Sequence, residues 1–153
     1  MARRLIEDVW NDRQLTFLDE VIDASYIYHD PNSPDFGQGP ESYKARVTVY
    51  ANAFPDMRLS IEDVIAEGDR VVLRWRASGT HKGELFGIAS TGKTAGGPGM
   101  SILHFRNGKV IQDWAVWDTL GLLRQLGVIP ATVMGQAAVV QEDAGWLGGA
   151  VDR

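Results

Sequence analysis

Two predicted hairpins constrain the fold of this chain more than any other feature of its sequence. The first is centred on Glu67-Gly68-Asp69-Arg70 and the second on Asn107-Gly108-Lys109, and runs typical of strands flank each turn. Successive hairpins build an antiparallel sheet, in which alternate side chains face the core and the solvent. The four strands are therefore expected at residues 59–66, 71–78, 100–105 and 110–118.

Helical patterns flank this strand-rich region on both sides. Apolar residues between positions 5 and 22 recur at helical spacings with a break near residues 11–13, which predicts two short helices. Residues 41–54 carry one apolar stripe on a longer helix that ends before Pro55. Three shorter segments are predicted as a strand at residues 26–29, a glycine-rich loop at 92–99 and a helix at 120–126. Helices that cover one face of a strongly bent antiparallel sheet make an α+β fold.

The length of 153 residues is that of one domain. We expect this domain to comprise residues 1–130. Residues 131–153 are rich in alanine and glycine, and Trp146-Leu147 is their only pair of large apolar residues. This segment is interpreted as a flexible or weakly docked extension rather than as a lid over a pocket.

Charge and composition exclude several classes of partner. The net charge of −5 disfavours binding to nucleic acids or anionic membranes, both of which attract basic patches. No apolar run approaches the roughly 20 residues that a membrane-spanning helix needs. The chain has no cysteine, and its three histidines lack the spacing of metal ligands. We therefore expect a soluble cytoplasmic protein without a metal ion.

A series of short motifs resembles a known family. The motifs are Ala53-Phe54-Pro55-Asp56, Gly79-Thr80-His81-Lys82-Gly83, Thr91-Gly92-Lys93, the turn at Asn107-Gly108-Lys109 and a final segment at residues 122–127. In this order they resemble the SnoaL-like polyketide cyclases of the nuclear-transport-factor-2-like superfamily, over roughly residues 5–130. The resemblance implies a cone-shaped α+β fold, with helices on the concave face of the sheet enclosing a deep pocket. It also implies small-molecule chemistry without a cofactor.

The resemblance further implies a histidine and an aspartate as an acid–base pair on the last hairpin. Those two positions fall on Ser101 and Ala115, and alanine cannot exchange a proton. The remaining pair of these types, His104 with Asp118, is excluded by geometry. A three-residue turn would pair position 104 with 110, which leaves Asp118 roughly 26 Å away at about 3.3 Å per residue.

Asp113 is the best candidate for a catalytic group. The same turn would place it opposite Ser101, on a strand face shared with Leu103 and Trp117. Within an apolar pocket, burial would raise the pKa of this carboxyl toward the range of a general acid or base at neutral pH. The alternative is that Asp113 is exposed to solvent or pairs with a nearby arginine such as Arg74 or Arg76.

Other candidates have both a functional and a structural interpretation. His81 follows a predicted strand, where it could shuttle protons or hold the next loop by hydrogen bonds. His29 could line the pocket from the end of the first strand. Trp75 and Trp117 could form the pocket wall or simply pack in the core. We assign His29, Trp75, Ser101, Leu103, Ala115 and Trp117 to the substrate pocket, and Asp113 and His81 to catalysis.

Three functions agree with these features. The first is a cofactor-free acid–base enzyme of the cyclase or isomerase type, acting on a polyketide-like or other polycyclic small molecule. The second is a small-molecule-binding protein without catalytic activity. The third is a hydroxylase or an epoxide-hydrolase-like relative. For the epoxide-hydrolase type, the required residue types are supplied by Arg74, Arg76, Asp113 and Asp118. Exposed apolar side chains such as Val116 on the outer sheet face favour a homodimer.

Overall fold

The computed structural model describes residues 1–130, and the predicted extension at residues 131–153 lies outside them. Five strands form one open sheet in the order β1-β5-β4-β3-β2. Neighbouring strands from β2 to β5 are antiparallel, whereas β1 pairs with β5 in parallel, so the expected antiparallel sheet is in fact mixed. The strand bounds are Ile22–His29 (β1), Arg58–Glu67 (β2), Arg70–Thr80 (β3), Thr94–Arg106 (β4) and Lys109–Trp117 (β5).

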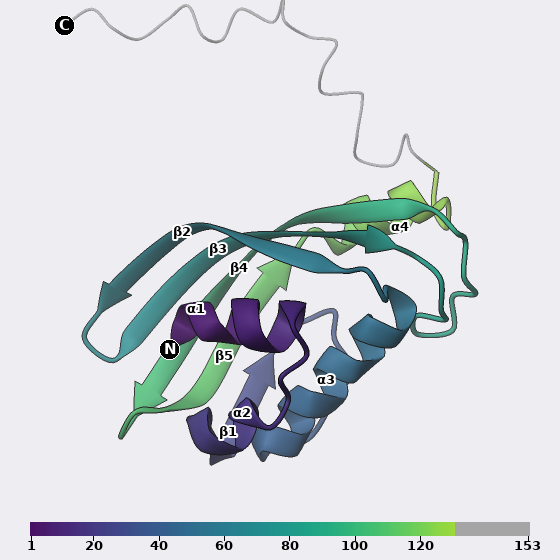
Figure 1. The fold of residues 1–153 in the computed structure, drawn as a ribbon. Helices are drawn as coiled ribbons and strands as arrows, with labels where there is room; N and C mark the ends of the chain where they lie inside the picture. The colour runs from purple at the N-terminus through teal and green to yellow at the C-terminus, as the bar shows by residue number, and fades with distance from the viewer. Residues whose placement is uncertain (131–153) are drawn as a thin grey trace, which may run out of the picture.

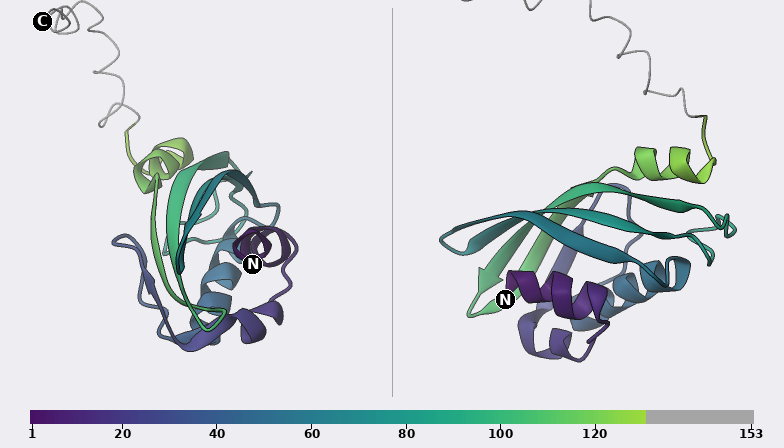
Figure 2. Two further views of the ribbon diagram at one scale, coloured as in Figure 1. Left: turned by 90° about the vertical axis from the view of Figure 1, so that its left-hand side faces the viewer. Right: turned by 45° about the horizontal axis from the view of Figure 1, so that its top comes forward.

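The helices confirm the predicted α+β architecture. The N-terminal helix begins as α1 and continues into a π-helical segment, η1. This helix, α2 and α3 all lie against the concave face of the bent sheet, whereas α4 packs on β4 near the end of the described chain (Figures 1 and 2). Among residues 1–130, no helix is both long enough and apolar enough to cross a bilayer. The bounds are Ala2–Arg4 (α1), Leu5–Asn11 (η1), Phe17–Val21 (α2), Gly39–Ala53 (α3) and Thr119–Leu126 (α4).

The hydrophobic core fills the space between these helices and the concave sheet face. The predicted stripe on α3 contributes Tyr43 and Val47, which are buried against the sheet. Leu73 of β3 and Leu103 of β4 are buried on the opposing side. Because the sheet bends around the helices, the core continues into the cavity described below.

The prediction of a glycine-rich loop was wrong for most of its length, since β4 begins at Thr94. Glycine is disfavoured in strands, but here β3 leaves no room for side chains. A Cβ atom at Gly96 would lie 2.0 Å from the carbonyl oxygen of Ala77. At Gly99 it would lie 2.4 Å from the indole of Trp75, the residue paired with Gly99 across the ladder. These glycines therefore let β4 approach β3 and its large aromatic side chain.

This packing predicts unequal effects of two alanine substitutions in β4. Gly99→Ala is expected to displace the Trp75 indole and lower the free energy of unfolding by about 1–3 kcal/mol, the usual cost of overpacking. Gly97→Ala is the matched control, because the nearest atom to its added Cβ would be the Cβ of Asp118, at 3.3 Å. Urea unfolding followed by tryptophan fluorescence measures both variants. Equal destabilisation by the two substitutions would contradict this account.

The last hairpin has a different register from the predicted one. Its turn contains two residues, Asn107 and Gly108, whose φ angles of 52° and 77° are typical of a type I′ turn. The register also shifts between His104 and Phe105, as in a β-bulge. As a result Ser101 pairs with Ala115, and the expected pairing of Ser101 with Asp113 was wrong.

His104 and Asp118 have separate surroundings, as the spacing argument required. His104 pairs with Gln112 in the β4–β5 ladder, six positions before Asp118 in the chain. The Asp118 carboxylate instead accepts a hydrogen bond of 2.8 Å from the backbone N–H of Gly121. Asp118 therefore caps the N-terminus of α4, a structural role.

Candidate functional site

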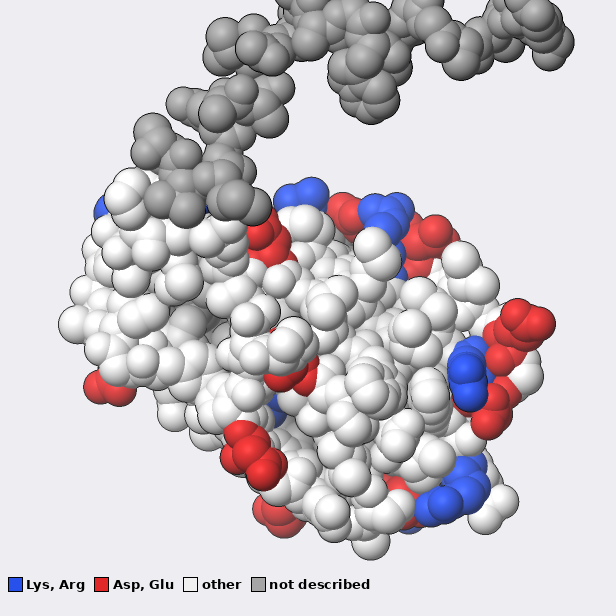
Figure 3. Space-filling view, turned by 180° about the vertical axis from the view of Figure 1, so that it is seen from behind, with Lys and Arg blue, Asp and Glu red and all other residues white. Residues whose placement is uncertain are grey.

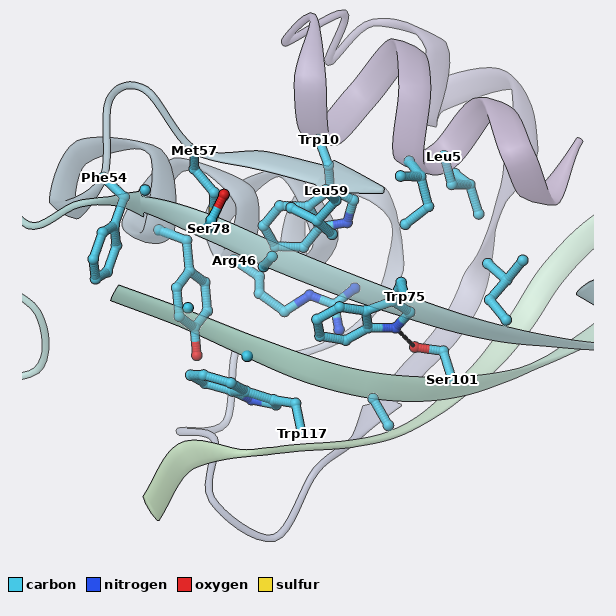
Figure 4. A pocket seen from close by; sticks show the side chains of 18 of the residues that line it. Leu5, Trp10, Arg46, Phe54, Met57, Leu59, Trp75, Ser78, Ser101 and Trp117 are labelled. Carbon is cyan, nitrogen blue, oxygen red and sulfur yellow. Dashed lines mark hydrogen bonds between the residues drawn. The ribbon is translucent and has the colours of Figure 1, made fainter. Parts of the chain in front are cut away.

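A cavity lies between η1, α3 and the concave sheet face. It contains about 870 Å³ of empty space, part of which opens to solvent. Most of its wall is apolar, which is the usual composition of a small-molecule site. Its aromatic residues come from both the helices and the sheet, and Figure 4 shows several of them around the cavity. They are Trp10, Tyr28, Tyr43, Tyr50, Phe54, Trp75 and Trp117.

Within the described chain, Arg46 and Asp113 are the charged residues that line this cavity. They approach from opposite sides, Arg46 from α3 and Asp113 from β5. Arg46 Nη2 donates a hydrogen bond of 3.1 Å to Asp113 Oδ2. The two residues are only 3% and 4% exposed, so they form a buried ion pair. Burial removes both charges from water, a cost that their mutual attraction offsets only in part.

Aromatic rings surround the Arg46 guanidinium. Its Cζ atom lies 3.5 Å from the ring centroid of Tyr28, 4.4 Å from that of Tyr43 and 5.7 Å from that of Trp10. Cation–π attraction to these rings compensates part of the lost hydration. A guanidinium also keeps its charge in proteins, so the cavity holds a permanent cation.

The Asp113 carboxyl retains an unused hydrogen-bonding atom. Burial raises the pKa of Asp113, against the opposing effects of the Arg46 charge and of hydrogen bonds from Arg46 and Tyr26. The Tyr26 hydroxyl donates to Oδ2 over 3.5 Å. Oδ1 of Asp113 and Nε of Arg46 are both buried without a hydrogen-bond partner among the described residues. A carboxylate with a free oxygen and a raised pKa is suited to proton transfer.

Five of the predicted pocket residues line this cavity. Trp75 Nε1 donates a hydrogen bond of 3.1 Å to the Ser101 hydroxyl, which fixes the indole in the wall (Figure 4). Trp117 is held from outside the cavity, where its Nε1 donates to Asp30 Oδ2 over 3.2 Å. The five residues are Trp75, Ser101, Leu103, Ala115 and Trp117.

The two predicted histidines lie elsewhere in the described structure. His81 is fully buried, stacks on Phe54 with centroids 5.1 Å apart, and accepts a hydrogen bond from the backbone N–H of Thr91. His29 stacks on Trp114, with centroids 3.8 Å apart, in a second groove on the outer side of the sheet. Neither histidine is among the described residues that line the cavity beside Asp113.

The arginines expected near Asp113 face away from it. Arg74 and Arg76 form exposed ion pairs with Glu62 of β2, and Asp118 caps α4. The alternation of side chains along β3 explains this arrangement, because Leu73 and Trp75 occupy the cavity face. The residues suggested for epoxide-hydrolase-like chemistry are therefore not brought together.

Arg46 is the site residue that the sequence analysis missed. It lies three residues after Tyr43 and four before Tyr50, so it falls within the apolar stripe of α3. An arginine on the buried face of an amphipathic helix breaks the pattern, and such a break is the signal that could have identified it.

The comparisons agree with this architecture. The model of the family described as SnoaL-like polyketide cyclase matches residues 1–126. The chain belongs to the SnoaL-like polyketide cyclase family. Aklanonic acid methyl ester cyclase AcmA of Streptomyces galilaeus is 31% identical over 131 residues, which cover 82% of this chain and 88% of AcmA.

Solved SnoaL-like structures share the fold. A candidate polyketide cyclase from Acidithiobacillus ferrooxidans superimposes with a TM-score of 0.74 at 32% identity, covering 83% of this chain and 92% of that one. AclR of Streptomyces galilaeus, a candidate hydroxylase, gives a TM-score of 0.72 at 26% identity and covers 84% and 94% of the two chains. At the level of the family, these relationships support a cyclase-type function on polyketides and hence a small-molecule substrate.

Proposed function

We propose that this SnoaL-like protein is a cofactor-free acid–base enzyme of the cyclase or isomerase type, acting on a polyketide-like or other polycyclic compound. The observation that carries the proposal is the Asp113 carboxylate, buried in an aromatic cavity with its Oδ1 atom free. Flat rings of a substrate would stack between the aromatic walls. The polar groups would then select which carbon reacts.

The proposed reaction begins with proton abstraction. Asp113 removes a proton from a carbon next to a carbonyl group, so the C–H bond breaks and an O–H bond forms on the carboxyl. The electron pair of the C–H bond passes into an enolate. The enolate carbon attacks a second carbonyl of the same molecule, which forms the new ring bond, and the resulting alkoxide takes the proton that Asp113 holds. Return of the Asp113 proton completes the cycle without an oxidant or reductant.

His81 is not required in this scheme. Its Nδ1 atom already accepts from the backbone of Thr91, and its ring is held against Phe54. These contacts support the structural alternative, in which His81 holds the loop between β3 and β4.

The function is tested by incubating the purified protein with aromatic polyketides, including methyl esters with an open precursor ring, and separating the products by liquid chromatography with mass spectrometry. Ring closure by aldol addition leaves the mass unchanged and alters retention and absorbance. We expect such a product with wild-type protein and a large loss of it with Asp113→Asn. Binding of these compounds without any conversion would overturn the proposal in favour of a binding protein.

One observation favours a second function of the hydroxylase type. AclR, the candidate hydroxylase, has the same fold at 26% identity. An oxygenated product with a mass increased by one oxygen atom, formed under air and absent under nitrogen, would identify that reaction in the same incubations.

We also propose that the protein forms a homodimer through the outer face of its sheet. Met100, Ile102, Trp114 and Val116 are exposed there on β4 and β5. Figure 3 shows this side of the molecule, with broad uncharged areas and charged side chains mainly toward the rim. Apolar surface of this kind marks an interaction site.

Val116→Glu is expected to shift the dimer toward monomer, because it places a charge in the middle of this apolar surface. Light scattering coupled to size exclusion at micromolar concentration measures the mass. Val128→Glu is the control, since Val128 is also exposed but lies after α4 and on none of the strands. A monomeric wild-type protein would contradict the proposal.

A further inference from the structure

The hydrogen-bonding capacity of Arg46 exceeds what the protein uses. A guanidinium carries five N–H donors, and Arg46 directs one of them to Asp113 while its Nε is buried without a partner among the described residues. In Figure 4 its side chain extends along the cavity toward Trp75. Unused donors on a buried cation are unfavourable unless an acceptor occupies them, so the site lacks an oxygen that a ligand can supply.

The charges of the cavity restrict which ligand can supply that oxygen. Arg46 contributes +1 and ionised Asp113 contributes −1, so the lining is neutral before a ligand binds. A carboxylate or another anion would leave one buried negative charge without compensation, which is costly in an apolar cavity. An uncharged carbonyl compound keeps the site neutral, and its oxygen can accept from Arg46.

Proton transfer also leaves this balance unchanged. When Asp113 takes a proton from the carbon next to the carbonyl, the carboxyl becomes neutral and the negative charge moves to the enolate oxygen. The sum with Arg46 is zero before and after the step. One cation is therefore enough, provided that it can contact the Asp113 carboxylate before proton transfer and the enolate oxygen after it.

We propose that Arg46 is a shared counter-ion, which pairs with the Asp113 carboxylate before proton transfer and with the enolate oxygen of the substrate after it. The substrate class that follows is an uncharged, enolisable aromatic ketone or ester. This inference rests on the proposed function for its reaction, but its central claim concerns binding and is tested without turnover.

The test uses 2-phenyl-1,3-indandione, a flat aromatic compound that is an enolate at neutral pH. If the cavity admits one anion beside Arg46, Asp113 must take up a proton when this enolate binds. Isothermal titration calorimetry at pH 7, in two buffers of different ionisation enthalpy, gives the number of protons bound. We expect an uptake approaching one proton per enolate in the wild-type protein and none in Asp113→Asn.

The role of Arg46 is isolated by comparing two variants that both lack the carboxylate. Arg46→Met/Asp113→Asn is expected to bind the enolate at least about 30-fold more weakly than Asp113→Asn, since it lacks the counter-ion. The analogue 2-methyl-2-phenyl-1,3-indandione cannot enolise, and its affinity should differ by less than about 3-fold between the two. Arg74→Met, which removes an exposed arginine outside the cavity, should leave enolate binding unchanged.

Several outcomes would overturn this inference. They are enolate binding without proton uptake, equal enolate affinity with and without Arg46, and binding of the neutral analogue while the enolate does not bind. If polyketide turnover is found but any of these results is obtained, the proposed function stands and the shared counter-ion is rejected. If proton-linked enolate binding is found but no compound is converted, the counter-ion stands and the enzymatic function fails.

Discussion

Turnover is expected to fall by about 10²- to 10⁴-fold when Asp113 is replaced by Asn, the range usually lost with a general acid–base group. Asn keeps the shape of the side chain and an oxygen for the hydrogen bond from Arg46, but it cannot take a proton. The measurement is kcat/KM on the compound that the incubations identify. Asp63→Asn is the matched control, because this carboxylate is exposed on β2 and outside the cavity, and it should retain full activity. Equal activity of the two variants would place the chemistry elsewhere.

The pH dependence of the wild-type reaction should also show that Asp113 acts as a base. A base must be ionised, so kcat/KM should rise with pH as Asp113 loses its proton. Because burial raises the pKa of Asp113, this rise should occur above the ordinary aspartate value of about 3.9. The residual activity of Asp113→Asn should lack this limb of the profile.

The second large effect concerns stability. Arg46→Met is expected to lower the free energy of unfolding by about 3–5 kcal/mol at pH 7, because it leaves the Asp113 carboxylate buried and unpaired. Arg46→Met/Asp113→Leu removes both charges and fills the space with apolar atoms. This double variant should regain most of the loss, since a buried ion pair and an apolar replacement are often of similar stability. Urea unfolding at equilibrium measures both.

The stability of Arg46→Met should also depend on pH with a defined sign. The pKa of Asp113 is already raised in the folded state, and removing the neighbouring cation raises it further. Between the unfolded and folded pKa values, the folded state therefore binds more protons than the unfolded state. Its free energy of unfolding falls as pH rises through this window and is highest on the acidic side. A destabilisation that is independent of pH would show that lost packing of Arg46, rather than the unpaired charge, is responsible.

Much of the fold follows from local sequence signals. The turn at residues 67–70 and the apolar stripe on α3 each predicted an element close to the observed one. These signals succeed because a hairpin turn and an amphipathic helix are specified by residues that are near one another in the chain. The parallel pairing of β1 with β5 depends instead on contacts between distant segments, and no local sequence pattern indicated this pairing.

The errors near the last two strands have identifiable physical causes. Glycine at positions 96 and 99 usually indicates a loop, but here close approach of β3 requires it within a strand. A shift of register between His104 and Phe105, together with the two-residue turn, changed which residues oppose one another. Predicted pairings are sensitive to such shifts, because a single extra residue alters every partner beyond it.

The candidate site was predicted only in part, because some of its residues follow from a local pattern and others from contacts between distant segments. Alternation along a strand assigned Asp113, Leu103 and Trp117 to one face, and all three line the cavity. The partner of Asp113 could not be found in the same way, since Arg46 comes from a helix 67 residues away in the chain. Charged residues on a helix usually face solvent, and only the tertiary fold shows that this one does not.

The direct pairing of Ser101 with Ala115 affects which carbon atom of a substrate would react in the proposed ring closure. These are the two positions at which the family resemblance implies an acid–base pair, and here both side chains are small. The carboxylate of Asp113 lies one step along the same face of β5, roughly 7 Å from position 115 at about 3.3 Å per residue. Consider a fused-ring substrate held as it would be in a relative with the acid–base pair at these two positions. Asp113 would then meet a different carbon atom of that substrate. The ring that closes would differ, although the scaffold around it is shared.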